Sequence, residues 1–239
     1  MSNYLARLTG TTILVCAAGA ATAQEELNAL VWCDHTDPAL IEPFEEKFNA
    51  KVNLREYEGT GAALALLEQS RPGDWDVLVI DGIDVFRAVD AGILAPLPAD
   101  DLPTADFFPE VVMEENNSAD GVVYAVTEKF GYNTISYNAD AVDEADMQDM
   151  AAVLSEKYAG RLSIYDYYLP VMGLAALADG IATADIDGTS LESIGATLST
   201  MKERSASVAG VVAAQTALAT GEVDIVVGGG EWLTAVLSN

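Results

Sequence analysis

Apolar residues in the first half of the chain recur in short blocks, each followed by a polar turn and then by apolar positions at helical spacing. Leu27 to Trp32 is an almost uninterrupted apolar run, typical of a strand in a parallel sheet covered on both faces. Asp37 and Pro38 mark a helix entry, because Asp can cap the first turn and Pro at the first helical position loses no hydrogen bond. This helix carries four apolar residues at helical spacing, Leu40, Ile41, Phe44 and Phe48. We expect this apolar face to pack on the sheet.

Two further strand-turn-helix units follow. Lys51 to Tyr57 is a predicted strand before a helix from Ala62 to Gln69, and Trp75 to Ile80 is a predicted strand before a helix from Val85 to Ala91. Three such units in close succession predict a parallel sheet with helical crossovers. The turns after the three strands then share one edge, where open α/β sheets bind ligands.

Candidate binding residues lie in these three turns. Trp32 ends the first strand and offers a stacking platform. Asp34 and Asp81 follow the first and third strands and can hold an ammonium group, since a carboxylate partly withdrawn from water gains from a cationic partner. Either could instead cap the helix that follows it. Thr60 lies in a short glycine turn whose backbone N–H groups can contact a solute.

The strand-helix pattern restarts in the second half of the chain. Extended segments at 122–126 and 133–137 predict the crossover into a second domain, after a stretch with four prolines. Beyond it we expect helices at 147–158, 171–179, 191–202 and 215–220, strands at 162–165 and 223–227, and a glycine turn at 228–230. Five candidate binding residues lie at the ends of these two strands. They are Tyr165, Asp166 and Tyr167 at the first strand, and Glu231 and Trp232 after the glycine turn of the second.

The first 23 residues predict export. Arg7 supplies a positive region, Leu8 to Ala20 an apolar core, and Ala21 to Ala23 a small-residue cleavage site, so we expect a periplasmic protein cleaved after Ala23. A lipoprotein processed at Cys16 is an alternative. The apolar core is shorter than the roughly 20 residues that span a membrane, and no later stretch is longer.

Composition excludes several classes of function. The formal charge of -27 makes nucleic acid an implausible partner, whether that charge attracts cations or reflects adaptation to a salty medium. After cleavage Cys33 is the only thiol, so no intramolecular disulfide can form. His35 is the only histidine, which excludes catalytic triads and His-rich zinc sites. We therefore expect a binding protein without cofactor, resident metal or catalytic activity.

Five short motifs occur in an order that resembles a known family. They are Trp32-Cys33-Asp34, Trp75 to Val79, Ala91 to Leu97, Tyr158 to Leu162 and Thr220 to Asp224. This order resembles the periplasmic solute-binding proteins of ABC transporters, specifically the spermidine/putrescine-binding branch of the type II fold. The resemblance implies an α/β protein of two lobes, each a mainly parallel sheet with flanking helices, at residues 24–129 and 130–239.

The resemblance also implies a function. Such proteins are monomeric receptors that close on one small solute and deliver it to an ABC transporter permease. In polyamine binders, aromatic rings stack on the methylene chain and carboxylates hold the ammonium groups. Relatives are longer, so we expect a C-terminally truncated sequence with an incomplete second lobe and hinge return. Pro170 and Gly229 replace an acid and a Trp of the branch, although Glu231 and Trp232 lie close to the latter.

Two alternatives stay open. Iron(III)-binding relatives place a His in the first turn and a Tyr pair in the second lobe, which His35 and Tyr167-Tyr168 resemble, although this pair follows a different strand. An exported hydrolase using paired carboxylates is the second alternative. Its acidic residues would need to share one cleft, whereas those of this chain are spread over many turns without a nucleophile motif.

Overall fold

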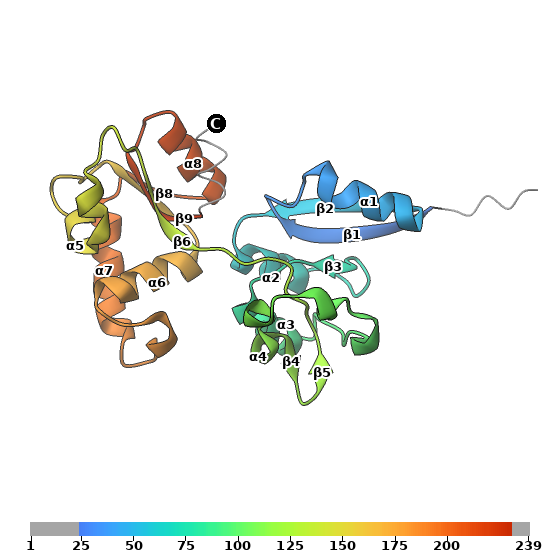
Figure 1. The fold of residues 1–239 in the computed structure, drawn as a ribbon. Coiled ribbons are helices and arrows are strands. Elements are labelled where there is room, and N and C mark those ends of the chain that lie inside the picture. Colours follow the sequence, from blue (N-terminus) through green and yellow to red (C-terminus); the bar gives the residue numbers. More distant parts are fainter. Residues whose placement is uncertain (1–23, 231–239) are drawn as a thin grey trace, which may run out of the picture.

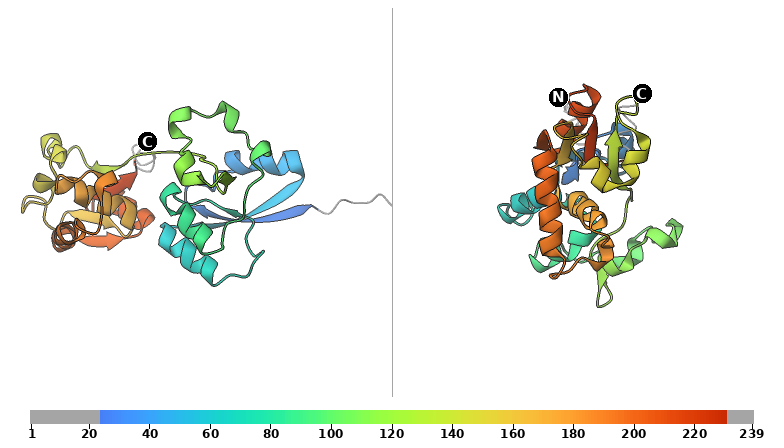
Figure 2. Two further views of the ribbon diagram at one scale, coloured as in Figure 1. Left: turned by 90° about the horizontal axis from the view of Figure 1, so that it is seen from below. Right: turned by 90° about the vertical axis from the view of Figure 1, so that its left-hand side faces the viewer.

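The structure, a computed structural model, describes residues 24–230 and consists of two α/β lobes joined by an extended segment (Figure 1). Lobe 1, residues 25–123, contains a three-stranded sheet, and lobe 2, residues 133–230, contains a four-stranded sheet. Figure 2 shows the connecting segment running from one lobe to the other. The predicted domain boundary after residue 129 falls in this segment and stays a prediction. Within residues 24–230, no helix has the length and apolar character needed to cross a membrane.

The sheet of lobe 1 has the strand order β2-β1-β3. β1 (Glu25–Trp32) lies at its centre and pairs in parallel with β2 (Ala50–Tyr57) and β3 (Val77–Leu78). The elements that follow these strands are α1 (Pro38–Phe48), α2 (Thr60–Glu68), η1 (Gly82–Asp84) and α3 (Val85–Asp90). The three predicted strand-turn-helix units are confirmed, with a third strand shorter than predicted. Trp32 pairs with Tyr57 at the carboxyl ends of β1 and β2, so both rings lie at the predicted edge.

The expected packing of α1 on the sheet is wrong. The helix begins as predicted, because the Asp37 carboxylate accepts a hydrogen bond from the Ala39 N–H at 2.9 Å. However, its apolar side chains at positions 40, 44 and 48 are 60%, 39% and 56% exposed. The Glu45 carboxylate accepts from the backbone N–H of Val52 at 2.7 Å, so α1 lies beside the outer edge of β2. Because Glu45 supplies an acceptor to an N–H group of this strand edge, the helix lies beside the edge and not on the face of the sheet.

The proline-containing stretch after α3 folds back onto lobe 1 through short elements. These are η2 (Ala99–Asp101), η3 (Thr104–Asp106), η4 (Pro109–Val111), α4 (Glu114–Asn117), β4 (Ser118–Ala119) and β5 (Val122–Val123). β4 and β5 form a hairpin whose turn residues, Asp120 and Gly121, have φ values of 52° and 78°. An Asp-Gly pair suits this turn because both residues tolerate positive φ. The Asn117 side chain donates to Val112 O at 2.7 Å and to Thr127 Oγ1 at 2.9 Å, which ties the start of the connecting segment to lobe 1.

Lobe 2 has the strand order β6-β9-β7-β8, and its first strand is antiparallel to the neighbour. The strands are β6 (Asn133–Tyr137), β7 (Leu162–Tyr165), β8 (Ser207–Ala209) and β9 (Ile225–Gly230). The helical elements are η5 (Glu144–Gln148), α5 (Met150–Val153), α6 (Tyr168–Ala178), η6 (Thr183–Asp185), α7 (Leu191–Arg204) and α8 (Val211–Ala219). The β7 and β9 side chains Leu162 and Ile225 to Val227 are almost fully buried, so these two central strands carry the core of the lobe.

Lobe 2 corrects two predictions. The predicted helix 147–158 is η5 followed by the one-turn helix α5, and Tyr158 lies in a turn where its hydroxyl donates to Asp146 at 2.7 Å. The predicted glycine turn 228–230 is instead the end of β9. Gly228 has a φ of 96° and would bring a Cβ to 3.3 Å from Tyr165 and Val171, so glycine is required there by conformation and by space.

Candidate functional site

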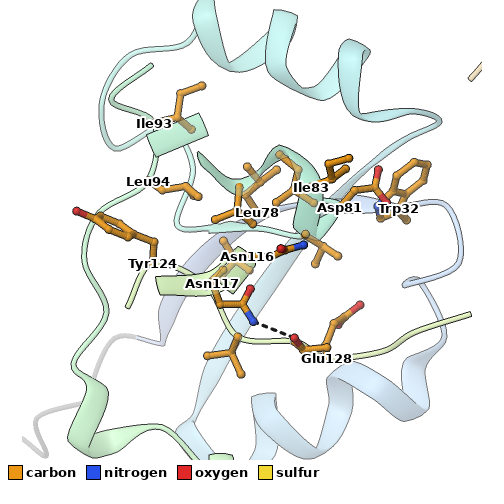
Figure 3. Close-up of a pocket in the computed structure, with 18 of the residues that line it drawn as sticks. Trp32, Leu78, Asp81, Ile83, Ile93, Leu94, Asn116, Asn117, Tyr124 and Glu128 are labelled. Carbon is orange, nitrogen blue, oxygen red and sulfur yellow. Dashed lines mark hydrogen bonds between the residues drawn. The ribbon is translucent and has the colours of Figure 1, made fainter. Parts of the chain in front are cut away.

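A cavity of about 1270 Å³ opens where the carboxyl ends of the lobe 1 strands face lobe 2. It extends into lobe 1 between β3 and the segments 91–97 and 124–130, as Figure 3 shows with Leu78, Ile93 and Tyr124 along its walls. Five of the predicted binding residues line it: Trp32, Asp34, Asp81, Tyr165 and Tyr167. The fold thus brings together turns that are more than 130 residues apart in the chain. This separation equals about the number of residues in a typical domain.

Three aromatic rings from both lobes meet beside this cavity. Trp32 ends β1 and Tyr57 ends β2, and their ring centroids are 4.7 Å apart. Tyr167, which precedes α6 in lobe 2, has its ring centroid 5.3 Å from that of Trp32. Rings at these separations attract one another and present π faces that also attract cations. The Tyr57 hydroxyl donates to the Val79 carbonyl, which fixes its ring against the third strand.

The Asp81 carboxylate lies among these rings. Its Oδ2 accepts hydrogen bonds from Thr60 Oγ1 at 2.6 Å and from the Tyr167 hydroxyl. Burial raises the pKa of Asp81, and the two hydroxyl donors only partly offset that rise. No hydrogen bond within the described chain reaches its Oδ1, and no basic side chain there forms an ion pair with it. The side chain makes no capping hydrogen bond to η1, so the capping alternative does not describe Asp81.

Asp34, by contrast, is neutralised within lobe 1. Its carboxylate accepts from His35 Nδ1–H at 2.7 Å and pairs with the Lys129 ammonium, while His35 Nε2 contacts Glu128. Burial would raise the pKa of Asp34, but the hydrogen bonds from His35 and Lys129 outweigh it and hold that pKa at about 2. Hydrogen bonds to Asp34 and Glu128 raise the pKa of His35 to about 9. Two carboxylates thus balance two cations, and the cluster ties the first turn to the connecting segment.

The other predicted residues have different positions. Thr60 is fully buried and does not line the cavity, but its hydroxyl donates to Asp81, which does. Tyr165 is buried, and its hydroxyl accepts from Gln215 Nε2 at 2.6 Å. Asp166 is exposed and does not line the cavity. Glu231 and Trp232, like the predicted signal segment 1–23, lie outside the described residues.

Sequence reasoning missed residues of three kinds. Tyr57 ends a predicted strand beside Trp32, so the parallel register carried a signal for it. Glu128 and Lys129 lie in a segment without periodicity, and nothing local shows that they return to the first turn, 93 and 95 residues away. Asp84 belongs to the turn after the third predicted strand, but nothing in the sequence predicts its contact: its carboxylate accepts from the Tyr168 hydroxyl of lobe 2.

The residues that resemble iron ligands have other partners. Both ring nitrogens of His35 contact carboxylates, those of Asp34 and Glu128. The adjacent phenols Tyr167 and Tyr168 donate to carboxylates of lobe 1 and face one another edge-on, with ring centroids 5.6 Å apart. The phenols thus act here as neutral donors, and burial together with the nearby carboxylates raises the pKa of both. A raised phenol pKa opposes the phenolate form that would bind iron.

The sequence of this chain matches a described family across both lobes. The profile of the bacterial extracellular solute-binding proteins aligns with residues 39–238. The chain belongs to this family. No curated protein matches this solute-binding protein.

Solved structures support the fold of this solute-binding protein. A putative spermidine/putrescine ABC transporter protein from Listeria monocytogenes has a TM-score of 0.73 at 19% identity, covering 90% of this chain and 65% of that chain. The agropinic acid complex of AgtB from A. tumefaciens R10 has a TM-score of 0.63 at 19% identity, covering 90% and 65%. Iron-bound HitA from Pseudomonas aeruginosa has a TM-score of 0.58 at 19% identity, covering 84% and 62%. The chain therefore spans less than two thirds of these chains.

These similarities confirm the predicted α/β, two-lobed type II periplasmic binding protein fold. The ligands named for the neighbours differ in charge and size, from a polyamine class to an organic acid and iron. The fold alone therefore does not specify the solute.

Proposed function

We propose that this protein is an extracytoplasmic receptor that binds a small cationic amine between its two lobes and delivers it to an ABC transporter permease. The observation that carries the proposal is the Asp81 carboxylate, half-buried among the Trp32, Tyr57 and Tyr167 rings, with one oxygen held by hydroxyl donors and the other without a partner in the described chain. An ammonium group suits this arrangement because it donates to a carboxylate while its charge lies over aromatic faces.

The electrostatics of the site favour a cation over an anion. Without a solute, burial raises the pKa of Asp81, because Thr60, Tyr167 and the charge of Lys129 supply only part of the compensation that its ionised form needs. An ammonium at Oδ1 would supply that compensation and lower the pKa again. Asp34 already has this compensation from His35 and Lys129, so we assign it to positioning the Trp32 turn and assign the solute contact to Asp81.

Within the amines, we propose a polyamine such as putrescine or spermidine. Its methylene chain would stack along Trp32 and Tyr167, with Thr60 orienting Asp81 and Tyr165 forming part of the lobe 2 wall. The similarity to the Listeria monocytogenes protein supports this class. Glu231 and Trp232 remain candidates for the second ammonium group, whereas Asp166, which is exposed and outside the cavity, is not assigned a solute contact. We propose a monomer that is exported by residues 1–23 and acts in the periplasm, without catalytic activity or cofactor.

Thermal unfolding of the purified protein with a panel of amines tests this proposal. At a concentration 100 times its dissociation constant, a solute that binds only the native state adds about 2.7 kcal/mol, which raises the melting temperature by about 5–10 °C for a chain of this size. We expect such shifts with micromolar putrescine or spermidine. The matched control is 1,4-butanediol, which keeps the methylene chain but has no charge and should give no shift. A protein that melts cooperatively but responds to no amine contradicts the proposal.

A further inference from the structure

The two lobes contact one another through few side chains. In addition to the contact between the Trp32 and Tyr167 rings, three hydrogen bonds connect the two lobes in the described chain. In each of them the acceptor belongs to lobe 1 and the donor to lobe 2. Carboxylates of lobe 1 accept, at Glu58, Asp81 and Asp84, and groups of lobe 2 donate. Each of these three hydrogen bonds therefore contributes to how the lobes are held against one another.

The bond between Tyr168 and Asp84 differs from the bond between Tyr167 and Asp81. Asp81 and Tyr167 line the cavity, so a solute that enters competes with their contact. Asp84 and Tyr168 do not line the cavity, so a solute in the cavity would not compete with their hydrogen bond. The Asp84 side chain is only 8% exposed, so its carboxylate has lost most of its water and depends on the phenol donor.

The surroundings hold the two partners in position. Asp84 ends η1 and precedes α3, and its Oδ1 lies 3.9 Å from Arg87 Nη1, which leaves Oδ2 for the phenol. Tyr168 is the first residue of α6, and its ring packs edge-on against Tyr167. The phenol therefore reaches across to lobe 1 from a rigid helix end.

A second hydrogen bond between the lobes also has its acceptor in lobe 1 and its donor in lobe 2. The Glu58 carboxylate accepts from the backbone N–H of Val212 at 3.2 Å, in the first turn of α8. The N–H groups of a first helical turn lack partners within the helix and carry partial positive charge, so a carboxylate from the other lobe is a favourable partner. Both contacts draw the same edge of lobe 1 toward lobe 2.

We infer that Tyr168 and Asp84 are positioning residues that hold the two lobes together in the absence of a solute and thereby set solute affinity without touching the solute. The binding-competent form is the one in which both lobes face the cavity. Apparent affinity falls in proportion to the fraction of molecules in that form. Removing a hydrogen bond that exists only when the lobes are together lowers this fraction.

Small-angle X-ray scattering of the ligand-free protein tests the first part of this inference. Tyr168→Phe keeps the ring and its packing but removes the donor, so we expect a larger radius of gyration than in the wild type. Asp84→Leu, which removes the acceptor and nearly keeps the volume of the side chain, should act in the same direction. In the double variant the two effects should not add, because both remove one bond. The control is Tyr137→Phe in β6, which removes a phenol from lobe 2 that makes no hydrogen bond to lobe 1 in the described residues, and it should leave the radius unchanged.

Calorimetric titration with putrescine tests the second part, which rests on the proposed function. Tyr168→Phe should weaken binding about threefold to tenfold, with a melting temperature close to that of the wild type without solute. The two proposals fail separately: if no amine binds the wild type, the scattering comparison still decides the inference. A wild-type radius of gyration in Tyr168→Phe and Asp84→Leu would overturn it, as would wild-type affinity in both variants.

Discussion

Replacing Asp81 with asparagine is expected to weaken amine binding at least about 30-fold. Removing one charge of a desolvated, hydrogen-bonded pair costs about 2 kcal/mol or more, which corresponds to that factor. Asparagine keeps the shape of the side chain and an acceptor for Thr60 and Tyr167, so the aromatic group should remain in place. Isothermal titration calorimetry with putrescine measures the loss.

The same substitution should not destabilise the protein. Because the pKa of Asp81 is raised in the folded state, its ionised form opposes folding at neutral pH, and a neutral amide removes that cost. We therefore expect an equal or higher melting temperature together with lost binding. Asp166→Asn is the matched control, since Asp166 is exposed and outside the cavity, and its affinity should stay within about twofold of the wild type. Loss of binding in Asp166→Asn but not in Asp81→Asn would reverse the assignment.

Local patterns predicted the scaffold well because its elements follow local chemistry. Asp37 and Pro38 start α1, and an apolar run forms β1, as expected from capping and burial. Patterns failed where a tertiary contact decides. The apolar positions of α1 cannot show that the helix lies beside β2, since this depends on Glu45 reaching the Val52 N–H. The three glycines ending β9 match a turn by composition, yet Gly229 and Gly230 pair with β6, and Gly228, with its positive φ, lies at an irregularity of this pairing.

The sequence predicted which edge of the sheet carries the site, but not which contacts each side chain makes there. The carboxyl ends of parallel strands meet by topology, so Trp32 and Asp81 could be placed together from the chain alone. The sequence did not show in the same way which of the two carboxylates forms ion pairs and which does not in the described chain. Asp34 and Asp81 have the same local pattern, a carboxylate just after a strand, but Asp34 forms ion pairs with His35 and with Lys129, which returns from a distant segment, whereas Asp81 accepts from the hydroxyls of Thr60 and Tyr167. Long-range ion pairing leaves no periodic signal in a sequence.

His35→Gln is expected to destabilise the protein by about 1–2 kcal/mol at pH 6. The imidazolium bridges Asp34 and Glu128, and the raised pKa of about 9, against a usual 6.5, reflects the free energy of these contacts. The full shift would correspond to a larger value, but the Glu128 side chain is 49% exposed and solvent screens its contribution. Glutamine can replace only one of the two hydrogen bonds and carries no charge.

The raised pKa of His35 determines in which direction the free energy of unfolding changes with pH. A group whose pKa is raised on folding stabilises the protein fully below its unfolded pKa and loses that contribution as the pH rises through its folded pKa. For His35 the free energy of unfolding should therefore fall between about pH 6.5 and 9 in the wild type, and this decline should be smaller in His35→Gln. Asp34, with a pKa of about 2, adds a separate decline as the pH falls from about 4 toward 2.

Denaturant unfolding followed by circular dichroism from pH 5 to 9 measures the loss of stability in His35→Gln and the decline in the free energy of unfolding that His35 causes as the pH rises. Lys51→Gln is the control, because Lys51 forms an exposed ion pair with Glu45 at 3.2 Å and should change stability by less than about 0.5 kcal/mol without altering the pH profile. Equal pH profiles for the wild type and His35→Gln would mean that the imidazole is not charged in the fold. The ion cluster would then not hold the connecting segment, and the Trp32 turn would need another source of rigidity. The predicted profile instead assigns Asp34 to the scaffold and leaves Asp81 as the carboxylate available to a solute.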